Sequence, residues 1–181
     1  KRKEALVGIA RNVKEIKGYV DEIVTASRED FLNLEVESGE FYLSEVMEAT
    51  NNRLQAKYRE IEENEVRFEE YMLDDAEYVF VAFGCSARIC EAVVDQLREE
   101  GIKAGLLRPV TLFPFPTKRL EELSGKVKSM MSIELNLGQM VDDVRLAVNG
   151  KCPVGFYGRQ GGIIYTPDEI VEAFKKFNNL K

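Results

Sequence analysis

Histidine and tryptophan are absent from this 181-residue chain, and cysteine occurs only three times. Because the chain has no histidine, it lacks the most common general base, the most common metal ligand and the usual partner of a nucleophilic serine or cysteine. A self-contained hydrolase triad is therefore not expected. Cys85, Cys90 and Cys152 have no paired CxxC spacing, so we predict no disulfide framework, metal site or iron–sulfur cluster held by this chain alone.

Basic residues are outnumbered, 25 against 32 acidic ones, which gives a net charge of −7 and a pI of about 4.9. Such a surface does not attract nucleic acid or an anionic membrane. No apolar run approaches the roughly 20 residues that a membrane helix needs, and the charged start, Lys1–Glu4, does not lead into an apolar signal core. We expect a cytoplasmic protein that binds neither nucleic acid nor a membrane.

Proline is missing before Pro109, so the first hundred residues can form long helices. Residues 1–42 make up an N-terminal segment that we expect to be helical in part and to which we assign no function. Apolar residues recur at three- and four-residue steps from Leu6 to Val20. Residues 31–41 fit a strand as well as a helix.

Residues 43–75 are predicted to form a long acidic helix or linker. Between Ser44, a suitable N-cap, and Met72 the apolar residues follow a helical stripe: Met47, Leu54, Tyr58, Ile61, Phe68 and Met72. The opposite face carries many carboxylates and is interpreted as solvated surface. We expect this helix to lie against its own domain, although its heptad-like spacing also permits a coiled-coil partner.

Residues 76–181 show the pattern of an α/β domain. Strands are expected at 78–83, 102–107, 127–133 and 154–157, and helices at 86–100, 119–123, 139–148 and from Thr166 onward. Strands that alternate with helices at this spacing are joined by right-handed crossovers. The predicted architecture is three layers, a mostly parallel sheet with helices on both faces.

A weak anion-binding candidate lies where the first of these strands passes into a helix. Gly84, Ser86 and Arg88 occur there, and free N–H groups at a helix start can hold an anion. Arg159, in the glycine-rich loop after the last strand, is a second candidate. The favoured interpretation is simpler, with Ser86 as an N-cap and Gly84 in a tight turn. Cys85 is either activated by the helix start or a buried, inert thiol.

Two other strand ends carry polar or aromatic residues. Arg108 precedes the run Phe113-Pro114-Phe115-Pro116, whose prolines fix φ and present both phenylalanines at little entropic cost, to the protein's own core or to a partner's pocket. Glu134 ends the third strand and could act as an acid or base, but no second carboxylate is evident nearby. The residues that follow it are Asn136, a candidate helix cap, Gly138 and Gln139.

These segments resemble the C-terminal domain of the alpha subunit of 2-oxoacid:ferredoxin oxidoreductases over about residues 43–177. Six matching segments occur in the family order: 57–67, 81–84, 101–109, 113–116, 134–140 and 156–162. The acidic helix through Glu62–Arg67 is most similar to the branched-chain, 2-oxoisovalerate group. Leu135 stands where the family more often has methionine, a nearly isosteric change.

The resemblance implies a fold like the C-terminal domain of transketolase, which braces an active-site dimer. The family converts a 2-oxoacid, coenzyme A and oxidised ferredoxin into acyl-coenzyme A, CO₂ and reduced ferredoxin, using thiamine diphosphate, magnesium and iron–sulfur clusters. It places these cofactors on other segments and on beta, gamma and delta subunits, so we assign this chain no catalytic, cofactor or metal residue. The implied contacts with partners are made by Arg108, Phe113, Phe115, Glu134, Asn136, Gly138 and Gln139.

Two other functions are consistent with the residues. The first is an independent anion- or nucleotide-binding module that uses residues 84–88 and 159–162. The second is a coiled-coil adaptor built on residues 44–72.

Overall fold

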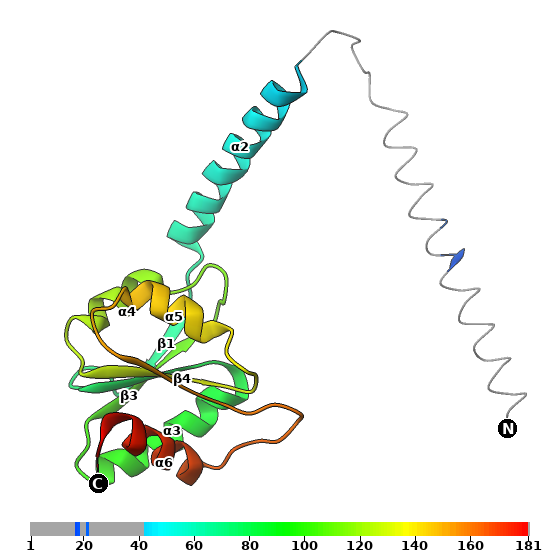
Figure 1. Ribbon diagram of the computed structural model, residues 1–181. Helices are drawn as coiled ribbons and strands as arrows, with labels where there is room; N and C mark the ends of the chain where they lie inside the picture. The colour runs from blue at the N-terminus through cyan, green and yellow to red at the C-terminus, as the bar shows by residue number, and fades with distance from the viewer. Residues whose placement is uncertain (1–16, 19–20, 22–41, 181) are drawn as a thin grey trace, which may run out of the picture. The chain divides into compact units, whose positions relative to one another are not determined.

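The computed structural model describes residues 17–18, 21 and 42–180 (Figure 1). The chain divides into two compact units, residues 1–49 and 50–181. Apart from the helical Lys17, Gly18 and Asp21, the predictions for residues 1–41 lie outside the described residues. No helix in the described ranges is both long and apolar enough to cross a membrane.

A five-stranded sheet in the order β1-β3-β2-β4-β5 forms the middle of the second unit (Figure 1). Its strands are β1 (Phe68–Tyr71), β2 (Tyr78–Ala82), β3 (Ala104–Pro109), β4 (Ser129–Glu134) and β5 (Val154–Gly158). The last four are parallel, and β1 pairs antiparallel with β3. The prediction of a mostly parallel sheet is confirmed.

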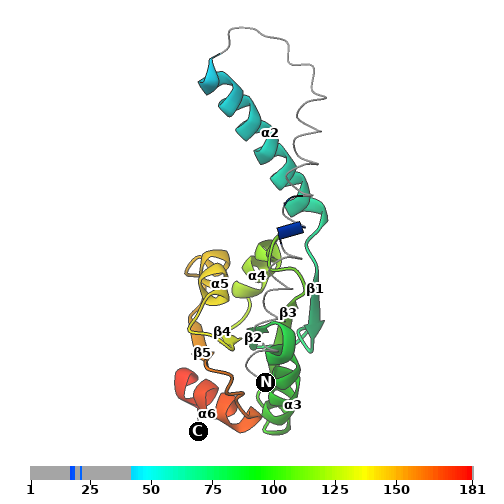
Figure 2. The same cartoon turned by 90° about the vertical axis from the view of Figure 1, so that its right-hand side faces the viewer.

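Helices cover both faces of this sheet (Figure 2). One face packs against α3 (Gly84–Glu99) and α6 (Pro167–Asn178), and the other against α4 (Thr117–Ser124) and α5 (Met140–Val148). The residues of β2 are all buried and alternate between the two faces, as expected for a strand buried on both sides. The three-layer architecture is confirmed.

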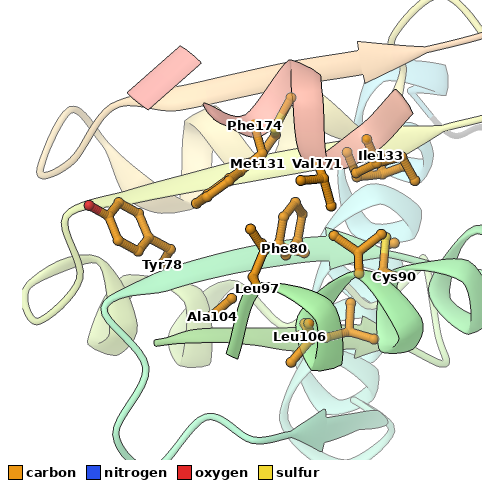
Figure 3. Packing of buried hydrophobic residues seen from close by; sticks show 14 of the residues in the cluster. Tyr78, Phe80, Cys90, Leu97, Ala104, Leu106, Met131, Ile133, Val171 and Phe174 are labelled. Carbon is orange, nitrogen blue, oxygen red and sulfur yellow. The ribbon is translucent and has the colours of Figure 1, made fainter. Parts of the chain in front are cut away.

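The core under α3 and α6 is built around Phe80 of β2 (Figure 3). Its ring lies 5.2 Å from the ring of Phe174 on α6, which also meets Tyr78 at 5.2 Å. Cys90 and Leu97 of α3 are fully buried in the same cluster. These contacts fix α3 and α6 on the sheet and thereby position the loops at the ends of the strands.

The helix boundaries follow the sequence signals in several places. Helix α6 begins at the expected place after Thr166, which forms a capping box with Glu169, and Pro167 is its first residue. Asn149 (φ 48°) ends α5 in the left-handed conformation, and Gly101 (φ 82°) follows the end of α3.

The long acidic helix is shorter than predicted. Helix α2 (Leu43–Asn64) ends at Asn64, and residues 68–71, expected to be helical, form β1. The reason is tertiary, because this segment pairs with the edge of β3, and Glu69 and Glu70 of β1 reach arginines at 2.8 and 2.6 Å. The sheet therefore begins before residue 76, and the predicted helix of residues 43–75 is divided into α2 and β1.

Helix α2 does not bury an apolar face. None of its residues, all of which the structure describes, is buried. Leu54 remains 36% exposed and Tyr58 44% exposed, and the Tyr58 ring meets Phe113 edge-on at 6.0 Å. Helix α2 thus contacts its own domain through Tyr58, in the part of the helix that belongs to the second unit, but the predicted apolar stripe is not buried there.

Candidate functional site

The predicted site residues lie at one edge of the sheet, at the carboxyl ends of β2, β3, β4 and β5 and in the segments that follow them. Because β2, β3, β4 and β5 are parallel, the loops that follow them leave from the same edge. These carboxyl ends are where open α/β sheets usually place ligands and contacts. The residues selected from the sequence by their places at strand ends thus share one edge of the sheet.

The residues that follow β2 form the start of α3, and some of them are buried in the domain. Gly84 (φ 58°) lets α3 begin immediately after the strand, with Phe83 at the N-cap and no described side chain capping the helix. The prediction of Ser86 as N-cap is wrong, because the helix starts earlier and Ser86 lies inside it, buried. The hydroxyl of Tyr165 donates to Ser86 Oγ at 2.6 Å, and burial raises the pKa of Tyr165 to about 12.

The two arginines predicted for anion binding have different surroundings. Arg88 on α3 is exposed. The guanidinium of Arg159 is partly buried and forms an ion pair with Glu169 of α6. Arg159 thus already has an anionic partner, and Arg88 together with the uncapped start of α3 is the remaining candidate for anion binding at this edge.

The three cysteines do not come together. Cys90 is buried in the core under α3 and α6, whereas Cys152 is buried in the core under α4 and α5. Burial raises the pKa of both thiols. Cys85 is exposed, so the interpretation of a buried, inert thiol is wrong for it. Within the described ranges, no group of three Cys, Asp or Glu residues could hold a metal ion.

Glu134 is the most fully hydrogen-bonded residue of the edge. Its side chain is completely buried and lies at the start of α5. The carboxylate accepts N–H groups of Gln139 at 3.1 Å, Met140 at 2.9 Å and Val141 at 2.8 Å, and the Ser132 hydroxyl at 2.9 Å. Burial works against ionisation, but these hydrogen bonds outweigh it and hold the pKa of Glu134 below its ordinary value. Glu134 thus caps α5.

The turn after Glu134 has its own hydrogen bond. Asn136 Oδ1 accepts the N–H of Gly138 at 2.7 Å, so it caps the turn, and the prediction that it caps α5 is wrong. Gly138 has a φ of 104°, a conformation that disfavours other residues, and an added Cβ would lie 3.1 Å from Val141 Cγ1. Gln139 is exposed at the N-cap of α5.

The loop after β3 is held firmly. Arg108 pairs with Glu69 of β1 at 2.8 Å. Thr111 Oγ1 accepts the Arg67 N–H at 3.0 Å and donates to the Pro114 carbonyl at 2.8 Å. This fixed loop leaves Phe113 62% exposed.

Phe115, by contrast, is partly buried against the core under α4 and α5. Of the two alternatives that the sequence left open, Phe115 packs against the protein's own core, and Phe113 is exposed and free to contact a partner.

A cavity of about 670 Å³ lies beside this loop. We call it the proline groove, defined by its apolar residues Val66, Phe68, Phe113, Pro114, Phe115 and Pro116. Charged residues from α2 and α4 form its rim: Glu62, Glu63, Lys118, Arg119 and Glu122. Sequence reasoning missed the groove because it continued α2 through residue 72. The signal that could have found it is the alternation of Val66 and Phe68 with Arg67 and Glu69, the period of a strand.

Comparisons with known proteins agree on one family. The family described as pyruvate:ferredoxin oxidoreductase core domain II matches residues 76–170. The chain is 42% identical over 153 residues to the ketoisovalerate oxidoreductase subunit VorB of Methanothermobacter marburgensis, covering 84% of this chain and 43% of that protein. It is 45% identical over 130 residues to VorB of Methanothermobacter thermautotrophicus, covering 72% and 37%. The chain thus spans less than half the length of these relatives.

Solved structures share the fold. A 2-oxoglutarate:ferredoxin oxidoreductase from Magnetococcus marinus, with 2-oxoglutarate, coenzyme A and succinyl-CoA bound, matches with a TM-score of 0.64 at 19% identity over 79% of this chain and 25% of that one. A split gene transketolase matches with a TM-score of 0.52 at 20% identity over 62% of this chain and 42% of that one. The expected likeness to transketolase is confirmed at the level of the fold. The sequence matches show that the chain belongs to the 2-oxoacid:ferredoxin oxidoreductase family, in which its residues 76–170 correspond to core domain II.

Proposed function

We propose that this chain is the assembly domain of the alpha subunit of a thiamine diphosphate-dependent 2-oxoacid:ferredoxin oxidoreductase that acts on branched-chain 2-oxoacids. The observation that carries the proposal is the 42% and 45% identity to two ketoisovalerate oxidoreductase subunits. In the proposed reaction the complex cleaves CO₂ from the 2-oxoacid, transfers the acyl group to coenzyme A and passes the released electrons to ferredoxin.

A structural rather than catalytic role is supported by how the polar residues of the sheet edge are used. The Glu134 carboxylate caps α5, Ser86 accepts from Tyr165 and Arg159 pairs with Glu169. Groups engaged in this way are not available as an acid, a base or a ligand.

The implied cofactors do not fit the described residues of this chain. The two buried cysteines lie in cores on opposite faces of the sheet, so they cannot share a cluster with Cys85. A magnesium ion and a diphosphate need several oxygen ligands in one place, and the described carboxylates do not gather. We propose that thiamine diphosphate, magnesium and the iron–sulfur clusters are held by other domains and by beta, gamma and delta subunits, and that coenzyme A and ferredoxin meet the complex there.

In this proposal the contact residues are at the carboxyl edge. Phe113, exposed on a hydrogen-bonded loop, is the best-presented anchor. Gln139 and the turn of Asn136 and Gly138 offer exposed or partly exposed polar surface. Arg108 and Phe115 hold the loop after β3 in place, Arg108 through its ion pair with Glu69 and Phe115 through its packing against the core. Buried Glu134 caps α5 and so fixes the start of that helix.

Purification from the native source tests the proposal. The tagged chain, with whatever travels with it, is assayed for dye reduction that depends on coenzyme A, using several 2-oxoacids. We expect thiamine- and cluster-bearing partners and the fastest reduction with branched-chain substrates. Faster reduction with pyruvate or 2-oxoglutarate would contradict the substrate class and leave the family assignment intact.

Calorimetry on the isolated chain tests the competing function, an anion-binding module at the uncapped start of α3 and Arg88. The proposal predicts no heat of binding with coenzyme A or nucleotides. Tight binding that Arg88→Ala abolishes would support the module instead.

A further inference from the structure

We propose that the proline groove is the docking site for a segment of another subunit, one that carries apolar side chains flanked by lysine or arginine. This inference rests on the proposed function, because it takes the partner to belong to the oxidoreductase complex. It adds the place on this chain and the chemistry of the segment that binds there.

The apolar part of the groove is open and preorganised. Phe113 is 62% exposed and Phe68 36% exposed, and both line the cavity. The loop that carries Phe113 is fixed by two hydrogen bonds of the Thr111 hydroxyl. It accepts the N–H of Arg67, the residue before β1, and donates to the Pro114 carbonyl. A partner therefore gains apolar contact without having to order this loop first. Exposed aromatic side chains in such a setting are typical anchors of protein interfaces.

The charges on the rim of the proline groove indicate the charge of the segment that binds there. Among the residues that the structure describes, Glu62 and Glu63 of α2 have no ion-pair partner and are exposed. On the α4 side, Arg119 is already bound by Glu70 at 2.6 Å and by Glu122 at 3.0 Å. Lys118 alone adds an unpaired positive charge to the rim. Two free carboxylates thus mark the α2 side of the groove as acidic, and a segment with basic residues complements it.

A second copy of this chain fits the groove less well. A two-fold contact places the same surface of both copies together. Among the described residues, the rim of each copy would then bring two unpaired carboxylates, Glu62 and Glu63, and one unpaired cation, Lys118, into the contact. The contact would hold an excess of negative charge, which disfavours binding. The charge pattern therefore favours a different polypeptide.

Two variants test the groove, each with a matched control. Phe113→Ala removes the anchor, and Leu146→Ala removes an even more exposed apolar side chain, 78% exposed on α5 and outside the groove. The double variant Glu62→Lys/Glu63→Lys reverses the rim charge, and Glu45→Lys/Glu48→Lys makes the same change in charge on exposed residues nearer the start of α2. The dissociation constant is measured between each tagged chain and the subunits that co-purify with the unaltered chain.

We expect Phe113→Ala to weaken binding by about tenfold or more, and Glu62→Lys/Glu63→Lys to weaken it and reduce its dependence on salt. Both controls should stay within about twofold of the unaltered chain. Thermal unfolding of each isolated variant separates lost binding from lost folding.

The results distinguish the groove from the assembly role. An intact complex that both groove variants leave unchanged would overturn the groove and leave the proposed function standing. A chain that co-purifies with no subunit would overturn both. Sedimentation that shows a dimer of the isolated chain, broken by Phe113→Ala, would identify a second copy as the occupant and refute the heterologous segment.

Discussion

At the scale of single residues, Glu134 shows how a carboxylate at a strand end can serve structure. It lies on the edge where ligands usually bind, yet its oxygens accept three backbone N–H groups and a hydroxyl. The start of α5 supplies the positive end of a helix dipole, which favours the ionised form. The buried charge is thereby stabilised without a cationic side chain.

Glu134→Gln should destabilise the domain by about 2 kcal/mol at neutral pH, because a charged acceptor is replaced by a neutral amide with one oxygen. The pKa of Glu134 is lower in the folded than in the unfolded chain. Its contribution is therefore present above the ordinary range of glutamate, about pH 4.3, and is lost as the pH falls through the lower, folded value. Urea unfolding at pH 7 and at pH 3 should show a smaller difference between the variant and the unaltered chain at the lower pH. An equal difference at both would contradict the assignment of charge.

Gly105 in β3 lies where there is no room for a larger side chain. A Cβ there would lie 2.6 Å from the Met72 carbonyl oxygen and 2.7 Å from Leu73 Cδ2, where the chain passes from β1 to β2. We expect Gly105→Ala to cost about 2 kcal/mol through overpacking. Gly125→Ala is the matched control, since the nearest atom, the Glu122 carbonyl oxygen, is 3.9 Å away. Equal urea midpoints for the two variants would contradict this prediction, because they would mean that the β1–β2 connection shifts to accommodate the added methyl group at little cost in free energy.

At the scale of elements, the sequence predicts the parallel strands and their helices because long apolar runs and caps are local signals. The β2 run Tyr78–Ala82 and the capping box at Thr166 are of this kind. Strand β1 was missed because its stabilisation is not local and comes from pairing with β3. The same limit applies to the site, where strand ends located the loops but the partner of Ser86 is Tyr165, 79 positions away in the chain.

The role of β1 predicts how shortened chains behave. A chain of residues 65–181 retains β1, and we expect its unfolding free energy to stay within about 0.5 kcal/mol of that of residues 50–181. A chain of residues 74–181 loses β1 and its contacts to Arg108 and Arg119, which leaves the edge of β3 unpaired. That chain should unfold at lower urea and associate at high concentration. Equal urea midpoints would mean that β1 adds little to the domain.

At the scale of the whole molecule, the domain combines a closed core with an open edge. Both faces of the sheet are covered by helices (Figure 2). Exposed apolar side chains remain in the loops after β3, β4 and β5: Val110, Leu112, Phe113, Leu137, Ile163 and Ile164. An exposed apolar surface of this kind is typical of a protein that works in contact with others, which agrees with a domain that spans less than half of its relatives.

The most direct measurement of the central claim is the mass of the tagged chain purified from its native source, determined by light scattering during size exclusion and paired with an assay of the same fraction. We predict a complex much heavier than the 20.6 kDa chain, and coenzyme A-dependent reduction of a dye that is faster with 3-methyl-2-oxobutanoate than with pyruvate. A chain that elutes alone at its own mass and reduces no dye would contradict the assembly role.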